Sequence, residues 1–167
     1  LRAQAAQWPN LAGLTPGMNL GPARSFLELL RTAPAEAEYF AFCDQDDVWL
    51  DDKLERAAAA LAVDGGPALY CSNVLLVDER LALLGPAPES GDTRFAHLLF
   101  ENIAYGCTVV LNRAARDLLV SQDPGAAVVM HDWWCALVIA AFGRIHYDPR
   151  PGVLYRQHGG NVVGQRG

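Results

Sequence analysis

The chain lacks several features by which common classes of protein are recognised. Its 167 residues carry 13 Lys and Arg against 19 Asp and Glu, a formal net charge of -6, and the basic residues form no cluster. Binding to nucleic acid needs clustered cations at the phosphates, so no nucleic-acid partner is expected. A glycine-rich phosphate loop with its lysine is also missing, which argues against a phosphoryl-transfer or nucleotidyltransferase domain.

Long apolar runs and paired cysteines are absent too. The longest apolar stretch, Trp133 to Phe142, is far shorter than the roughly 20 residues needed to cross a bilayer, so no transmembrane segment is expected. The cysteines Cys43, Cys71, Cys107 and Cys135 lie far apart, without the Cys-x-x-Cys pair that indicates zinc or a redox dithiol. Reduced core thiols in a cytoplasmic protein are the favoured interpretation.

Apolar residues make up 51% of the chain, enough for the core of one domain. Periodicity and turn signals predict helices at 1–8, 22–33, 50–62, 93–100, 112–122 and 131–143, and strands at 11–15, 39–43, 67–78, 107–111, 144–148 and 152–156. Asn112 is the expected cap of its helix, and residues 85–91, rich in proline and glycine, are a candidate lid. Alternating strands and helices predict an α/β layered domain with functional loops at the carboxyl ends of the strands.

The densest group of charges follows the strand at 39–43. Asp44, Asp46 and Asp47 repel one another unless a positive charge lies between them, and a hard divalent cation, which can in turn hold a diphosphate, commonly supplies it. In an extended chain Asp44 and Asp46 share a face, whereas Asp47 lies on the other and can cap the next helix. A polar turn without a ligand remains the alternative.

A second acid, Asp132, opens the most apolar helix of the chain and follows His131. One interpretation is a helix cap, which this position favours when taken alone. The other is a general base that accepts a proton from a hydroxyl, with Trp133 or Trp134 stacked on a sugar face.

The last strand is followed by His158, next to a glycine-rich tail. Its ring nitrogen is a candidate ligand for a metal or a phosphate, and Arg156 adds a cation suited to a diphosphate. A surface histidine is the alternative.

A further polar segment, Asn102 with residues 105–108, leads into a buried strand. Gly106 would let a ligand approach the backbone closely, although an ordinary tight turn explains the same residues.

Taken together, these segments resemble a known family. YFAFCDQDDVWLDDKLERA, NIAYGCT, HDWW and VLYRQHGGNVVG, in this order and spacing, are similar to the family 2 glycosyltransferases, in particular the rhamnosyltransferase-like branch that builds bacterial surface polysaccharide. The resemblance runs from about residue 19 to 164. It implies a GT-A fold, a Rossmann-like α/β domain with a mostly parallel mixed sheet, and metal-dependent sugar transfer with inversion.

The resemblance also implies cofactors and partners. Mg²⁺ or Mn²⁺ is the expected cofactor, a nucleotide-sugar with dTDP-rhamnose as first candidate is the donor, and the acceptor is a saccharide or a lipid-linked sugar. A lipid-linked acceptor would bring this cytoplasmic protein to the inner face of the membrane.

Residue by residue, the resemblance makes Asp44 the acid that faces the nucleotide, Asp46 the metal-binding acid and Asp132 the catalytic base. His158 resembles a late-chain ligand of the metal or diphosphate. The remaining matches are Asn19 and Gly21 to a loop near the nucleotide, and Asn102, Gly106 and Cys107 to the acceptor side.

One departure from the family concerns the start of the chain. Its members begin with two further strands that hold the nucleobase, and this sequence, which opens at Leu1 without an initiator Met, has neither. Residues 1–167 are therefore expected to form one partial catalytic domain that lacks its first strands. A non-catalytic sugar- or nucleotide-binding module with the same fold is the alternative.

Overall fold

The computed structural model describes residues 17–88, 90–122, 124–125 and 128–157. The helix expected at 1–8 and the strand expected at 11–15 lie outside the described residues. Among the helices of the described part, none is both long and apolar enough to cross a membrane.

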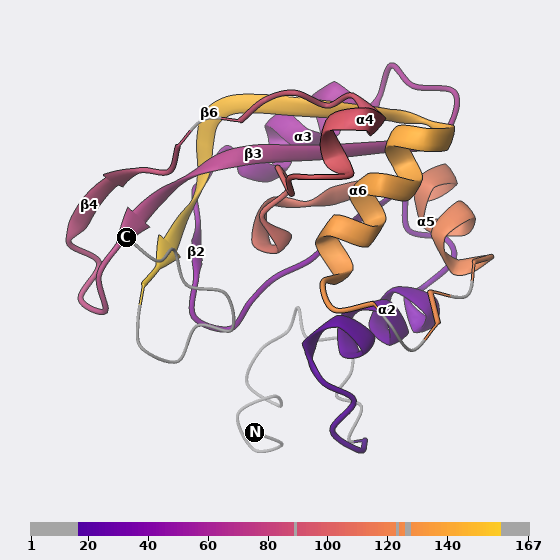
Figure 1. The fold of residues 1–167 in the computed structure, drawn as a ribbon, viewed down its shortest axis with the longest axis horizontal. Coiled ribbons are helices and arrows are strands. Elements are labelled where there is room, and N and C mark those ends of the chain that lie inside the picture. Colours follow the sequence, from indigo (N-terminus) through magenta and orange to yellow (C-terminus); the bar gives the residue numbers. More distant parts are fainter. Residues whose placement is uncertain (1–16, 89, 123, 126–127, 158–167) are drawn as a thin grey trace.

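A mixed, six-stranded sheet forms the centre of the described structure (Figure 1). Its strands are β1 (Tyr39–Ala41), β2 (Val48–Trp49), β3 (Ala68–Val77), β4 (Leu83–Pro86), β5 (Val110–Asn112) and β6 (Arg144–Arg156). The order is β1-β5-β3-β6-β2, and β4 also pairs with β3.

The expectation of a mostly parallel sheet is wrong for the part of the chain that the structure describes. There only β3 and β6 pair in parallel, whereas the β1–β5, β3–β5, β3–β4 and β2–β6 pairings are antiparallel. For β3 and β4 the reason is their short connection, residues 78–82, which has too few residues for the helical crossover that a parallel pair requires.

Helices cover both faces of the sheet. They are α2 (Pro22–Thr32), α3 (Lys53–Leu61), α4 (Phe95–Leu98), α5 (Arg113–Val120) and α6 (His131–Phe142), and a 3₁₀ turn, η1 (Gly106–Thr108), precedes β5. The predicted cap of α5 is confirmed, because the side chain of Asn112 accepts a hydrogen bond from Ala115 N at 2.9 Å.

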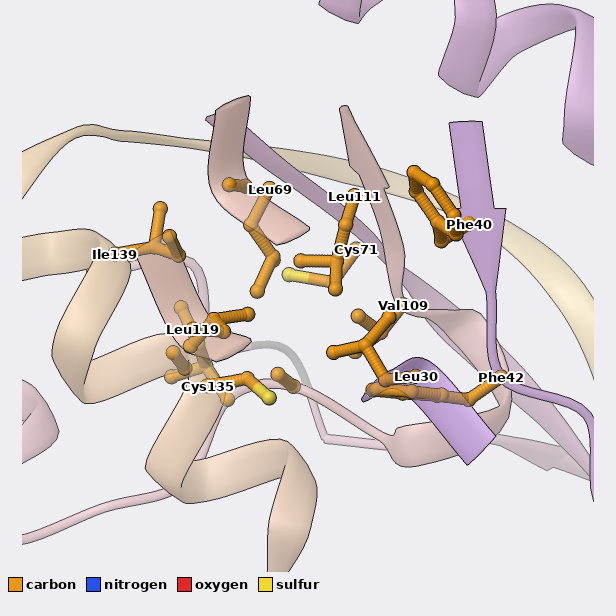
Figure 2. Close-up of a cluster of buried hydrophobic side chains, with 14 of the residues drawn as sticks. Leu30, Phe40, Phe42, Leu69, Cys71, Val109, Leu111, Leu119, Cys135 and Ile139 are labelled. Atoms are coloured by element: carbon orange, nitrogen blue, oxygen red, sulfur yellow. The ribbon is translucent and has the colours of Figure 1, made fainter. Parts of the chain in front are cut away.

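The core lies mainly between the sheet and α6 (Figure 2). Successive residues of β3 alternate between two clusters, as side chains on a strand must. Leu69 and Cys71 pack with α5 and α6, whereas Ala68 and Tyr70 pack with α3 on the opposite face. The sheet is thus covered on both sides, the three-layer arrangement of an α/β domain.

The two strands predicted near the end of the chain are the halves of the single strand β6. Asp148 pairs with Ser72 and Val153 with Val74, so β6 bulges outward between these two positions. The carboxylate of Asp148 holds the bulge, because it accepts hydrogen bonds from Arg56 at 2.6 Å and from Tyr70 at 3.0 Å. The candidate lid begins within β4, so part of it is a paired strand.

Candidate active site

The three acids lie on a short loop between β1 and β2, and the end of β6 holds this loop in place. The main-chain N–H of Arg156 donates to Asp47 Oδ1 at 2.9 Å, and its Nε donates to the carbonyl of Asp46 at 2.8 Å. The guanidinium also donates to the carbonyl of Glu79. Arg156, which the sequence suggested as a diphosphate ligand, therefore positions the acidic loop.

The loop brings together a different pair of acids from the one predicted. Donor atoms of Asp44, Asp47 and Cys107 all lie within 4.8 Å of one another. The chain bends at Gln45 and Asp46, so it is not extended, and Asp47 turns back towards Asp44. Asp47 does not cap α3, whose N-cap residue is Asp52. The expectation that Asp44 and Asp46 share one face, with Asp47 on the other, is therefore wrong.

These carboxylates stand in a strongly negative field. Burial, together with the charges of Asp47, Asp46 and Asp132, raises the pKa of Asp44 to about 6. Burial also raises the pKa of Asp47, which the hydrogen bond from Arg156 partly offsets. A hydrogen bond from the Cys107 thiol also lowers the pKa of Asp47, and its buried Oδ2 receives no other hydrogen bond from the described residues. Asp44 and Asp47 could therefore hold a cation.

Asp132, the predicted base, lies close enough to the acidic loop for its charge to contribute to the raised pKa of Asp44, after burial and the charges of Asp47 and Asp46. It lies in the first turn of α6, where Met130 is the N-cap residue, and its side chain is 8% exposed. Trp133 N donates to Asp132 Oδ1 at 2.7 Å. Burial raises the pKa of Asp132. Hydrogen bonds from the Asn102 side chain and the Gly106 backbone lower it, but by less than burial raises it.

Asn102 and Gly106 were predicted on the acceptor side, and the structure places both against Asp132 itself. A Cβ atom on Gly106 would lie 3.4 Å from Asp132 Oδ2 and 3.1 Å from His131 Nε2, so the backbone approaches closely only because this residue is glycine. His131 stacks on Phe26 with ring centroids 4.2 Å apart. Burial lowers the pKa of His131 to about 4, which leaves the imidazole neutral near pH 7.

The two tryptophans point to separate places. Trp133 Nε1 donates to the carbonyl of Leu98 at 2.6 Å and so fixes α6 to α4. Trp134 lines a cavity of about 520 Å³ together with residues of α2 and α5, and none of the site carboxylates borders this cavity.

Within the described ranges, no hydrogen bond joins the other predicted residues, Asn19 and Gly21, to the acids. Asn19 Oδ1 accepts the N–H of Gly21 at 3.0 Å, and Gly21, at φ 77°, begins α2. His158 lies outside the described residues.

Sequence reasoning missed Lys53, the single lysine of the chain. It is 0% exposed, and its Nζ lies 3.7 Å from the centre of the Trp49 ring without a hydrogen-bond partner. Burial lowers its pKa to about 8, and the Cys107 and Cys43 thiols act in the opposite direction. Burying a lysine without a hydrogen-bond partner costs free energy, so such a residue indicates a functional site once the structure is known. Its position at the start of a helix gave no such signal.

Comparison with known proteins adds one relationship. No protein-family model matches the chain. The chain is 28% identical, over 172 aligned positions, to the curated dTDP-rhamnosyl transferase RfbG of Shigella flexneri. The match takes in 94% of this chain and 57% of the relative, so the chain spans little more than half the length of that protein. This similarity supports a relationship to glycosyltransferases.

Proposed function

We propose that this chain is the catalytic part of an inverting glycosyltransferase that transfers a sugar from a nucleotide-sugar to a saccharide or lipid-linked acceptor. Rhamnose from a dTDP-linked donor is the first candidate, because the similar protein is a dTDP-rhamnosyl transferase. The observation that carries the proposal is the approach of Asp132 to the acidic loop, close enough for its charge to raise the pKa of Asp44. Bacterial surface polysaccharide is the proposed product, and the cytoplasm the proposed location.

The residues of the loop fit a hard divalent cation. Asp44, with Asp46 or Asp47, would hold Mg²⁺ or Mn²⁺ through carboxylate oxygens. The fit rests on the donor atoms of Asp44, Asp47 and Cys107, which lie within 4.8 Å of one another, and on the neighbouring negative charges that, together with burial, raise the pKa of Asp44. His158 is kept as a proposed further ligand. The cation, when bound, supplies positive charge that stabilises the leaving nucleoside diphosphate.

Asp132 is the proposed general base. Its carboxylate accepts the proton of the acceptor hydroxyl, whose oxygen then attacks the anomeric carbon from the face opposite the leaving group and so inverts the configuration. Asn102 and the Gly106 N–H hold the carboxylate in one orientation. Burial raises the pKa of Asp132 and thereby makes it a stronger base than an exposed aspartate.

Two measurements on the full-length protein test the proposal. Calorimetry with dTDP and Mn²⁺ measures binding at the loop, and release of dTDP from dTDP-rhamnose in the presence of acceptor measures turnover. We expect both binding and turnover, and we expect Asp44→Asn to weaken binding of dTDP with Mn²⁺ more than Asp117→Asn, an exchange on the exposed side of α5. Binding without turnover for every nucleotide-sugar tried would favour the non-catalytic module.

A further inference from the structure

The group formed by Asp44, Asp47 and Cys107 contains a thiol, which the proposed magnesium or manganese chemistry does not use. The two carboxylates come from the acidic loop and the thiol from η1, and donor atoms of all three lie within 4.8 Å of one another. Cys107 is 0% exposed, and burial, followed by the charge of Asp47 and a hydrogen bond to it, raises the pKa of its thiol, so the sulfur and that carboxylate face each other.

The Cys107 thiol and the Asp47 carboxylate are hydrogen-bonded to each other. Beside them lies Lys53, a residue that is 0% exposed, whose Nζ has no hydrogen-bond partner and lies 3.7 Å from the centre of the Trp49 ring. Burial and the charges of Asp47 and Asp44 raise the pKa of the Cys107 thiol, and the positive charge of Lys53 offsets only part of this rise. Cys107 is therefore a neutral thiol in the metal-free protein, and a bound cation would have to replace its proton.

A thiolate beside two carboxylates is not a ligand set for magnesium. Mg²⁺ prefers six oxygen ligands in an octahedron, whereas Zn²⁺ and Cd²⁺ bind thiolate strongly and accept carboxylates as additional ligands. With Lys53, the thiolate and the two carboxylates carry a net charge of -2, which one divalent cation neutralises.

We propose that Asp44, Asp47 and Cys107 form a site for a thiophilic divalent cation such as Zn²⁺, and that its occupation inhibits the enzyme. Binding forms the metal–sulfur bond as the thiol proton leaves to solvent. The bound ion takes Asp44 and Asp47 away from the donor cation, and this regulatory part rests on the proposed function. The binding part rests only on the geometry.

Cadmium provides a direct probe, because a cadmium–thiolate bond absorbs in the ultraviolet. The experiment uses the full-length protein carrying Cys43→Ser, which removes the exposed thiol. We expect one equivalent of Cd²⁺ to give the absorption band, and excess Mg²⁺ alone to give none. Cys107→Ser should abolish the band and weaken Zn²⁺ binding by at least about 100-fold, since even changes behind the direct ligands weaken metal binding about 10- to 100-fold.

Cys71→Ser is the matched control, because Cys71 is also 0% exposed but lies in the core against α6. It should keep the band. A band that survives Cys107→Ser, or no band in the parent protein, would overturn the proposed site.

Turnover with Mg²⁺, measured on the same samples, separates this inference from the proposed function. Zn²⁺ should inhibit turnover of the parent protein and of Cys71→Ser, and Cys107→Ser should be less sensitive, relative to its own rate without Zn²⁺. Normal Mg²⁺-dependent turnover without a cadmium band contradicts the zinc site alone. A cadmium band without any turnover contradicts the proposed function alone.

Discussion

Arg156 and Asp47 are 109 residues apart in the sequence and joined at 2.9 Å, through the main-chain N–H of one and the carboxylate of the other. The same arginine holds the Asp46 carbonyl through its Nε. The last residue of β6 thus fixes the acidic loop, on which the proposed donor site depends.

Replacing Arg156 by alanine should loosen that loop. The main-chain hydrogen bond to Asp47 remains, but the guanidinium contacts to the carbonyls of Asp46 and Glu79 are lost. Because hydrogen bonds to a charged group contribute about 1.5–3 kcal/mol, the free energy of unfolding should fall by about 2 kcal/mol. Urea titration measures this, and Arg80→Ala, at an exposed position, is the control. Equal stability of the two variants would show that the guanidinium does not hold the loop.

Gly106→Ala tests how closely Asp132 is positioned. The new methyl group would lie 3.1 Å from His131 Nε2 and 3.4 Å from Asp132 Oδ2, so one of the two side chains must shift. Because displacement of a reacting group by about 1 Å can cost about 100-fold in rate, turnover should fall by about 10- to 100-fold. Gly65→Ala is the control, since a Cβ there meets nothing within 4 Å. Unchanged turnover in Gly106→Ala would mean that this contact does not orient the base.

The pKa of Asp44 predicts how stability depends on pH. Its folded-state pKa, about 6, is above the ordinary aspartate value of 3.8, so the folded state binds more protons between these values and stability falls as pH rises through this window. Allowing for solvent screening, Asp44→Asn should stabilise the metal-free protein by about 1–2 kcal/mol near pH 7.5, and by much less near pH 4. Thermal unfolding at both pH values checks this, with the exposed Asp51→Asn as control. A stabilisation that is the same at both pH values would contradict the shift.

Asn112 links a helix to the sheet. Its Oδ1 accepts from Ala68 N at 3.0 Å and from Ala115 N at 2.9 Å, and its amide donates to the carbonyl of Gly66. Asn112→Ala leaves buried groups without partners and removes the cap, so the free energy of unfolding should fall by about 2–3 kcal/mol. Chemical denaturation measures the loss, and Ser121→Ala, at an exposed position, should change stability little.

Local patterns of the sequence predicted the helices well. Pro22, the cap at Asn112 and the end of α6 at Gly143 are decided by neighbouring residues, and each appears where expected. Strand direction was mispredicted, because it depends on which strands pair and on connection lengths that a local pattern does not contain.

The site was predictable only in part, for the same reason. The run of acids identified the loop, but a bend at Gln45 and Asp46 decided which carboxylates meet. Arg156 and Cys107, which lie against these acids, come from distant segments of the sequence, and the charge of Lys53, which acts on Cys107, is buried. The resemblance to glycosyltransferases suggested a place for Asn102 and Gly106, but their contact with Asp132 appeared only in three dimensions.

The most direct test of the central claim is the turnover of Asp132→Asn in the full-length protein, with donor affinity measured on the same sample. Asparagine keeps the shape of the side chain but cannot accept the proton of the acceptor. Because general base catalysis contributes about 10²- to 10⁴-fold, turnover with dTDP-rhamnose and Mg²⁺ should fall by at least about 100-fold while the donor still binds. Turnover near that of the unaltered protein, with donor binding intact, would contradict the assignment of Asp132 as the base.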